Sequence, residues 1–467
     1  MKTRKNILLA FAVIVISGSS SVYAATIEVG SGKPYTTIQS AITAATTGDT
    51  ILVYDGTYKE TIIVGKKLIV KSVNGSGSTT IDATGHGSMT SAVAFSSGLG
   101  RDTELDGFTI AHGVNFQGGN INCYNSSPTI SNCFVYGGGS VYGAGIYCAG
   151  VASPLIANCV ISGNLCAYGG GIYCKSSASP TIMNCTISQN RTDNDGSITN
   201  ASGAGIFCDS ASATVINTII WGNTANGVPN TIHLKSGSSV SVSYSDIEGG
   251  WTGTGNIGSD PQFVMQGYWS NNGTAYIGDD YWVPGDFHLQ AISPCIDNGT
   301  SSGAPSIDIE GTPRHQGAGF DMGAYEYAEP TTTTTVVTTS TTTTAPPTTT
   351  ISSTTTVPPT VVNLINFNAI SGNRIVTLVW STASELDNSG FNLYRADLED
   401  GEYNKINDSL IPSQGSSTQG ANYEFIDTAV QNRKTYYYKL EDIDLNGNSS
   451  THGPVSATPR WLYGFVK

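Results

Sequence analysis

The chain has 467 residues, of which 12 % are charged and 55 are glycine, and its formal net charge is −14. This length is greater than that of one ordinary domain, so we expect at least two. A chain with so little positive charge has no general electrostatic attraction to DNA, RNA or anionic lipid. The net charge therefore argues against a function in which a basic surface binds nucleic acid or a membrane.

Residues 1–24 have the pattern of a secretory signal peptide. MKTRKN is basic, ILLAFAVIVISG is a short apolar run, and Val22-Tyr23-Ala24 takes the place of the cleavage site. We therefore expect export to the medium or the cell surface, with the mature chain starting near Ala25. The alternative is an uncleaved anchor. No later apolar stretch is long enough to cross a bilayer, so we expect no membrane insertion.

One helix is predicted in the segment YTTIQSAITAATTGD, residues 35–49. Thr36 or Thr37 can cap its N-terminus, and its apolar side chains fall on one face. Short strand-and-corner pieces follow, such as GDTILVYDG and ELDGFTIAHG. A helix placed before a stack of strands would protect the bare edge of the first strand. We therefore expect it to cap the N-terminal end.

The densest charged group in the strand-rich region lies in RDTELD, where Asp102, Glu104 and Asp106 precede His112. Carboxylates in a cluster can bind a cation, and a nearby histidine can act as a proton acceptor in lyase chemistry. These four residues are the catalytic candidates. The favoured alternative is a solvated loop in which Asp106 and the following glycine form a corner.

A repeat follows, in which GIYCAGVASPLIANCVISGN, GIYCKSSASPTIMNCTISQN and GIFCDSASATVINTIIWGN begin at residues 145, 171 and 205. Each copy alternates apolar and polar residues and is divided by Gly, Asn and Ser, as short strands with tight corners require. A period of this length indicates a solenoid. We predict a parallel β-helix with three strands per turn, whose coils lie about 4.8 Å apart.

In such a coil Ile146 and Cys148 point inward and Tyr147 points outward. The repeated cysteines are then small apolar core residues, and we expect most of them to stay reduced, although the pairing of the nine is open. The outward positions of successive coils hold Asn122, Tyr147, Tyr173 and Phe207. Aromatic rings in a column can stack on sugars, so these four are the candidate ligand-binding residues. The alternative is that the rings pack against covering loops.

The later part of the chain divides at a Thr/Pro/Ser-rich stretch, residues 329–360, which reads as a linker. Before it, Asp308, Arg314 and Asp321 are expected to form a structural ion-pair cluster. After it, residues 361–459 read as a β-sandwich with Trp380 in its core and a corner tyrosine among residues 436–438. Residues 460–467 form a tail that matches no sorting signal.

A weak calcium pattern lies in the sandwich, where Asp442, Asp444 and Asn446 begin like an EF-hand loop. Its twelfth position is Gly453 instead of glutamate, so a hairpin turn is favoured. We expect that no cofactor is required and that calcium is the one ion the protein could take.

Residues 25–328 resemble the right-handed parallel β-helix superfamily, the pectin-lyase-like fold. YTTIQSAITAATTGDTILVYDGTYKETIIV is similar to its capping helix and first coil, and the I-x-N-C-x-I pieces to its coil repeat. The closing segment SPCIDNGTSSGAPSIDIEGTPRHQGAGFDMGAYEY, residues 293–327, resembles that of bacterial exported β-helix proteins of the choice-of-anchor class. WSTASELDNSGFNLYR in the last region resembles fibronectin type III-like modules.

The expected fold class is therefore all-β, a right-handed solenoid with an N-terminal capping helix followed by a sandwich. This fold hosts many functions, so it implies none alone. We expect a monomeric, exported, surface-associated protein that binds an extracellular polysaccharide or cell-surface glycan, or that acts as an adhesive or structural module. The alternative is a polysaccharide lyase or glycoside hydrolase that acts on an acidic, plant or algal polysaccharide.

Overall fold

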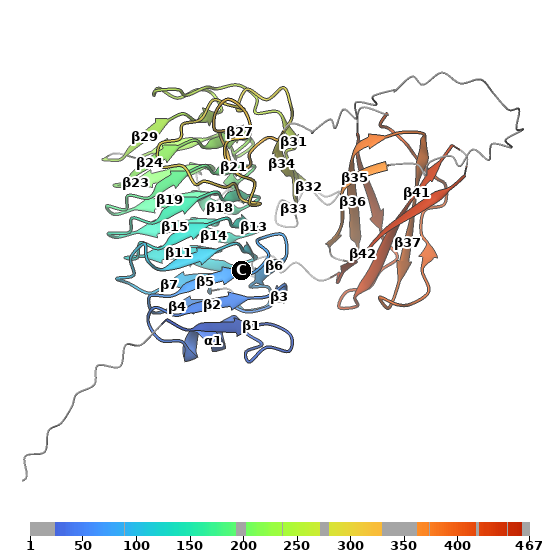
Figure 1. Cartoon of the computed structure of the whole chain (residues 1–467), viewed down its shortest axis with the longest axis horizontal. Coiled ribbons are helices and arrows are strands. Elements are labelled where there is room, and N and C mark those ends of the chain that lie inside the picture. The colour runs from blue at the N-terminus through green and yellow to red at the C-terminus, as the bar shows by residue number, and fades with distance from the viewer. Residues whose placement is uncertain are drawn as a thin grey trace, which may run out of the picture. The chain divides into compact units, whose positions relative to one another are not determined.

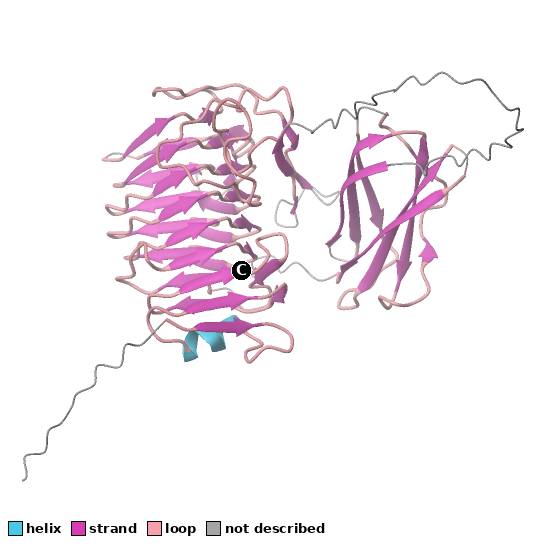
Figure 2. Cartoon of the chain, in the orientation of Figure 1, coloured by secondary structure: helices cyan, strands magenta, loops and turns pink. Residues whose placement is uncertain are grey.

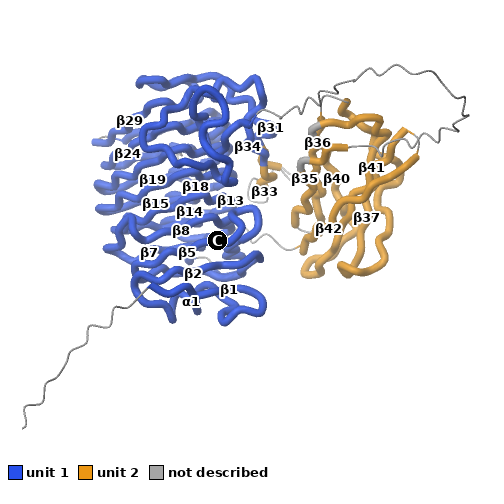
Figure 3. Tube along the Cα trace, viewed as in Figure 1, with its two compact units in different colours: residues 1–266, 285–329 blue, residues 267–284, 330–467 orange. Residues whose placement is uncertain are grey.

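The computed structural model describes residues 24–87, 89–192, 202–235, 237–270, 280–328, 362–372, 374–416, 420–445 and 447–459. Figure 3 shows two compact units: residues 1–266 with 285–329, and residues 267–284 with 330–467. The predicted signal peptide up to residue 23, the Thr/Pro-rich linker and the tail lie outside the described residues.

Unit 1 is a solenoid of stacked parallel strands, visible as a tier of arrows in Figures 1 and 2. Two of its sheets run its whole length. Sheet A contains β1 (Thr26–Val29), β2 (Thr50–Val53), β5 (Ile69–Ser72), β8 (Glu104–Asp106), β12 (Thr129–Ser131), β16 (Leu155–Ala157), β20 (Thr181–Met183), β24 (Ser212–Ile216) and β29 (Ser239–Ser243). Sheet B contains β3 (Gly56–Tyr58), β6 (Thr79–Asp82), β9 (Thr109–Ala111), β13 (Phe134–Tyr136), β17 (Val160–Ser162), β21 (Thr186–Ser188), β25 (Ile219–Trp221) and β30 (Asp246–Ile247).

Two further sheets complete the coils. Sheet C contains β4 (Ile62–Val64), β7 (Val93–Phe95), β11 (Ile121–Tyr124), β15 (Ile146–Ala149), β19 (Ile172–Lys175), β23 (Ile206–Asp209) and β28 (Ile232–Leu234). Sheet D contains β10 (Val114–Gln117), β14 (Gly139–Tyr142), β18 (Leu165–Tyr168), β22 (Arg191–Thr192), β26 (Thr224–Ala225) and the antiparallel β27 (Val228–Pro229).

The number of strands per turn changes along the solenoid. The first coils run through sheets A, B and C, which is the three-strand turn that the sequence predicts. From β10 onward a strand of sheet D is inserted between the B and C strands of each coil, so the prediction of three strands is wrong for the later coils. Gly137, Gly163 and Gly222 lie between the B and D strands with φ of +61° to +68°. They permit the additional corner because glycine adopts left-handed backbone readily.

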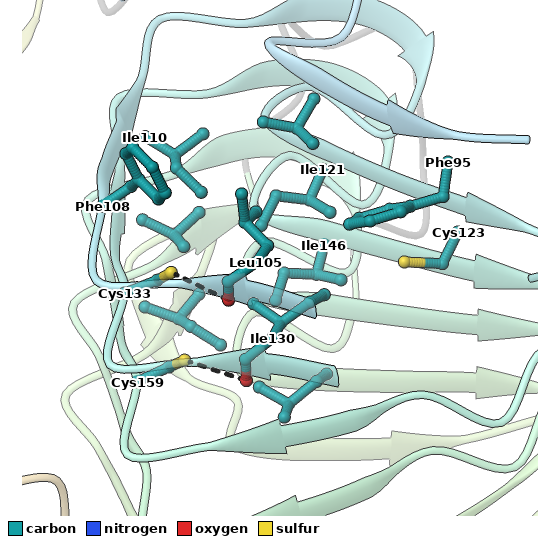
Figure 4. Close-up of a cluster of buried hydrophobic side chains, with 14 of the residues drawn as sticks. Phe95, Leu105, Phe108, Ile110, Ile121, Cys123, Ile130, Cys133, Ile146 and Cys159 are labelled. Carbon is teal, nitrogen blue, oxygen red and sulfur yellow. Dashed lines mark hydrogen bonds between the residues drawn. The ribbon is translucent and has the colours of Figure 1, made fainter. Parts of the chain in front are cut away.

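The predicted internal columns are confirmed. Ile146 pairs in register with Ile172, and Ile172 with Ile206, and all three side chains are fully buried. The column Cys123–Cys148–Cys174–Cys208 runs beside them in the same sheet. Figure 4 shows how the buried side chains of successive coils stack upon one another. Burial of these apolar columns along the whole axis is the main source of stability of the solenoid.

A second column of cysteines consists of Cys133, Cys159 and Cys185, and their thiols point at main-chain carbonyls. Sγ of Cys133 lies 3.9 Å from the carbonyl of Leu105, and Sγ of Cys159 lies 3.6 Å from that of Ile130 (Figure 4). All nine cysteines are free and buried. Burial raises the pKa of the Cys159 thiol well above its ordinary value, so its reactive thiolate form is strongly disfavoured.

Two ladders of asparagine hold the corners. Asn164, Asn190 and Asn223 are fully buried, and each passes a side-chain hydrogen bond to the next, of 2.9 and 3.0 Å. The corners between sheets A and B carry a second ladder, whose members have φ near +50°. Asparagine fits there because it tolerates left-handed backbone and its amide bonds to a copy of itself. Members of the second ladder are Asn132, Asn158, Asn184 and Asn217.

The helix α1 (Ile38–Ala44) is present, with Thr37 as its N-cap. Ile38, Ala41 and Ile42 are buried in the same core as the strands. In Figure 1 the helix lies beside β1, which is the first strand of sheet A. That it prevents association of this edge with other strands stays a prediction.

The closing segment docks along the second asparagine ladder. Asn158 donates to the carbonyl of Ile307 at 2.7 Å, and Asn217 donates to that of Thr300 at 2.7 Å. The guanidinium of Arg314 is fully buried and pairs with Glu326 at 2.8 Å. The expected ion pairs of Arg314 with Asp308 and Asp321 are therefore replaced, because both aspartates accept hydrogen bonds from main-chain N–H groups.

Along the chain, the residues between the last coil and the closing segment form two antiparallel strand pairs. In unit 1, β31 (Phe263–Met265) pairs with β34 (Asp286–Leu289). In unit 2, β32 (Tyr268–Ser270) pairs with β33 (Tyr281–Val283), and Val283 packs with Val379 and Ile370.

The rest of unit 2 consists of two antiparallel sheets. One contains β35 (Val362–Ser371), β36 (Val376–Glu385) and β40 (Asn422–Asp427). The other contains β37 (Asn388–Ala396), β38 (Asn404–Lys405), β39 (Ile411–Pro412), β41 (Tyr436–Asp444) and β42 (Ser449–Ala457). Trp380 is 1 % exposed and stacks on Tyr423, as expected for a core tryptophan. The hydroxyl of Tyr436 accepts a hydrogen bond from the main-chain N–H of Gln431, which is the bond expected of a corner tyrosine.

Candidate functional site

The candidate ligand-binding residues do form one column on the outer side of sheet C. Asn122 pairs in register with Tyr147, Tyr147 with Tyr173, and Tyr173 with Phe207. The rings of the three aromatic residues stack almost parallel, with centroids 5.7 and 5.1 Å apart. His233 of β28 continues the stack at 4.9 Å from Phe207. We call these four rings the aromatic ladder.

The expectation that this ladder is an open stacking surface is wrong. Tyr147 and Tyr173 are each 2 % exposed, and Phe207 is 5 % exposed. Asn122 is half-buried and donates to the carbonyl of Gln117 at 2.9 Å. The sheet D strand of each coil covers the outer side of sheet C, so the alternative of packing against a covering segment describes these rings.

The covering residues are Tyr142 of β14 and Tyr168 of β18. They pack against the buried ladder, and their own rings stack at 5.5 Å with an angle of 13°. Phe116 of β10 meets the ring of Tyr142 edge-on at 5.5 Å and is 55 % exposed. We call Phe116, Tyr142 and Tyr168 the outer aromatic cluster, because it is the layer of this stack that solvent reaches.

The sequence contains a signal for the outer cluster that the prediction missed. Tyr142 and Tyr168 stand at the same place before each GIYC, in YGAGIYC and YGGGIYC. Gly143 and Gly169 separate the two tyrosines of each coil at φ near +70°, where a side chain would collide with Tyr147 or Tyr173.

Charged groups border the cluster on the sheet C side. The ammonium of Lys175 lies 5.4 Å from the centroid of the Tyr142 ring. Asp209 accepts from the hydroxyl of Tyr173 at 3.4 Å and pairs with Lys235 at 3.1 Å. Burial, followed by the nearby charge of Asp209, raises the pKa of Tyr173 above its ordinary range. The site therefore offers aromatic surface with hydrogen-bonding groups at its border.

The catalytic candidates do not converge. Asp102 pairs with Lys67 at 2.7 Å, and Asp106 pairs with Lys71 at 2.6 Å, both on the sheet A side. Glu104 lies between them on β8, partly buried. His112 follows β9 of sheet B and pairs with Asp82 instead, at 2.9 Å. Within the described residues no hydrogen bond or ion pair joins His112 to the three acidic candidates, because they leave the coil on different faces.

The calcium candidates lie at a hairpin, as the favoured alternative predicts. Asp442 is buried and accepts from His452 at 2.6 Å, and Asp444 accepts from the main chain and the side chain of Asn448. Asn446 lies outside the described residues. Across the described part of the chain, no three His, Cys, Asp or Glu side chains come together as a metal ion would need.

A comparison with protein families supports the solenoid. Residues 69–247, from β5 to β30, match the family described as the right handed beta helix region. A solved structure of the pectin methylesterase from Aspergillus niger is similar at a TM-score of 0.30 and 18 % identity, over 48 % of this chain and 76 % of that one. An amylopullulanase of Thermoanaerobacter thermohydrosulfuricus is 32 % identical over 85 residues, which is 18 % of this chain and 5 % of that protein.

A search of the described helices for one both long enough and apolar enough to cross a bilayer finds none.

Proposed function

We propose that this protein is an exported, surface-associated glycan-binding module, and that the outer aromatic cluster is where an extended polysaccharide binds. The observation that carries the proposal is the partly exposed stack of Tyr142 and Tyr168, which ends in the largely exposed ring of Phe116. Sugars present C–H groups on one face and hydroxyls at their edges, and aromatic rings with polar neighbours suit both.

The surroundings of the cluster support this proposal. Lys175 and the pair of Asp209 and Lys235 supply donors and an acceptor beside the rings. The buried aromatic ladder beneath the cluster holds the covering tyrosines in place, so that little side-chain entropy is lost on binding. The short match to a protein named for pullulan is consistent with a role involving polysaccharides.

Affinity electrophoresis tests the proposal. The purified mature chain is run in native gels that contain pullulan, pectate, alginate or chondroitin sulfate, and its retardation gives a dissociation constant. The double variant Phe116→Ala/Tyr142→Leu removes the exposed ring and its neighbour. We expect at least a ~10-fold weaker dissociation constant, because each lost aromatic contact is worth about 1 kcal/mol.

Ile63→Ala is the matched control. Ile63 occupies the same outward column of sheet C, but in a coil without a sheet D strand, and it is 59 % exposed. This variant should bind as the unmodified protein does. Equal binding by the double variant and the control, with both folded by circular dichroism, would show that the cluster is not the binding site.

The alternative of a lyase or hydrolase is tested on the same four polysaccharides. A lyase would produce unsaturated ends that absorb ultraviolet light, and a hydrolase would release reducing ends. Either product, formed in proportion to protein concentration, would replace the binding function with an enzymatic one.

A further inference from the structure

Asp82 and His112 form a hydrogen-bonded pair on the outer side of sheet B, whereas the outer aromatic cluster lies on sheet D. Asp82 ends β6 and His112 follows β9, one coil later. Nδ1 of His112 lies 2.9 Å from Oδ1 of Asp82, whose side chain is only 11 % exposed. Thr84 also donates to Oδ1 of Asp82, from its hydroxyl at 2.6 Å and from its main-chain N–H at 3.0 Å.

This pair fixes the tautomer of the neutral imidazole. An ionised carboxylate only accepts hydrogen bonds, so Nδ1 of His112 must donate to it. Burial opposes ionisation of Asp82, but the hydrogen bonds from His112 and Thr84 outweigh it and hold its pKa well below the ordinary value. In neutral His112 the proton therefore stays on Nδ1, and Nε2 is left as a hydrogen-bond acceptor.

The neighbouring residues make room for this ring and add an aromatic surface. Asp82, Ala111 and Tyr136 occupy one column across β6, β9 and β13. His112 packs edge-on against Tyr136, with centroids 5.4 Å apart. A Cβ atom at Gly137 would lie 3.0 Å from the carbon next to Nε2 and 3.3 Å from Nε2 itself, so a larger residue there would press on the ring of His112.

We propose that His112 and Tyr136 form a second sugar subsite, in which Nε2 of His112 accepts a hydrogen bond from a sugar hydroxyl beside the ring of Tyr136. Asp82 is a positioning residue in this subsite. The inference rests on the proposed glycan-binding function but uses different residues on a different sheet. The ligand class is a neutral or acidic saccharide with a free hydroxyl next to an apolar ring face.

The test uses the full mature chain and the same four polysaccharides. His112→Gln retains a polar side chain but loses the Nε2 acceptor that Asp82 fixes, and we expect about five-fold weaker binding, the value of one neutral hydrogen bond. His86→Gln is the matched control, since His86 is exposed and its imidazole bonds to the carbonyl of Lys59. It should leave binding unchanged.

A spectroscopic measurement follows the imidazole directly. In protein labelled with ¹⁵N-histidine, the His112 ring is assigned by the signals that His112→Gln lacks. It should have the Nδ1–H form, and its Nε2 signal should shift when an oligosaccharide of the bound polymer is added. Unchanged Nε2 signals, or equal binding by His112→Gln and His86→Gln, overturn the subsite and leave the outer cluster standing. Binding of none of the four polymers by the unmodified protein overturns the proposed function and the subsite with it.

Discussion

Asn190→Ala removes one member of the fully buried asparagine ladder. Its Nδ2 donates to the carbonyl of Ile161 at 2.8 Å and to Oδ1 of Asn223 at 3.0 Å. Its Oδ1 accepts from the main-chain N–H of Asn164 at 3.2 Å and from Nδ2 of Asn164 at 2.9 Å. Four hydrogen bonds therefore depend on one side chain in a place that solvent does not reach.

The expected cost follows from the groups left behind. The substitution takes the acceptor from the main-chain N–H of Asn164 and one donor from the carbonyl of Ile161. Nδ2 of Asn164 also loses an acceptor but keeps its bonds to the carbonyls of Val135 and Ser162. A buried polar group without a partner costs about 1–3 kcal/mol. Because alanine supplies neither donor nor acceptor, we expect the free energy of unfolding to fall by at least about 2 kcal/mol.

Urea denaturation followed by circular dichroism measures this loss. Asn74→Ala is the matched control, because Asn74 is an exposed asparagine that bonds only to the carboxylate of Asp55. We expect the control to change the unfolding free energy by less than about 0.5 kcal/mol. A loss below about 1 kcal/mol for Asn190→Ala would refute the idea that this ladder stabilises the coils.

Three further predictions follow from the buried groups of unit 1. Arg314→Ala leaves Glu326 charged, buried and unpaired, so it should cost about 3–5 kcal/mol and release the closing segment to limited proteolysis, whereas an unaltered digestion pattern would contradict the pairing. Burial raises the pKa of Asp246, and also that of Asp321, to about 6 from 3.8, so the folded state binds protons that the unfolded chain has lost. The free energy of unfolding should therefore fall as pH rises from 4 to 6, and Asp246→Asn should reduce that slope in urea melts while Asp321 retains its share; an unchanged slope would contradict the burial of Asp246. The nine cysteines are free and buried, so a thiol reagent should react with none in the native protein and with nine in denaturant; fast native reaction would show an opened core.

The columns of the solenoid could be predicted because they follow from the sequence repeat. Ile146, Ile172 and Ile206 occur at the same position of near-identical repeats, and stacked coils place such positions in register. The inward direction of Cys148 then followed from the alternation of a strand. The turn at Asp444 was predictable for a different reason: a short polar segment between two alternating strands can adopt few turn conformations.

The exposure of Tyr147 could not be predicted in the same way. Alternation decides which side of a strand a residue occupies, but what covers that side depends on a separate segment. The covering strand β14 is short and lies between Gly138 and Gly143, so its sequence resembles a loop. The pair of Asp82 and His112 was missed because these two residues lie in different coils and belong to no repeated phrase.

The inserted strands of sheet D separate the residues that form the core from the residues that form the exposed surface. The first coils close without such a strand, so the inner columns of Ile and Cys do not need it. Later coils carry it as an outer layer, and its residues decide what the solvent meets. Descendants of this chain could therefore exchange that layer for another, and acquire new ligands, while the interior that folds them stays the same.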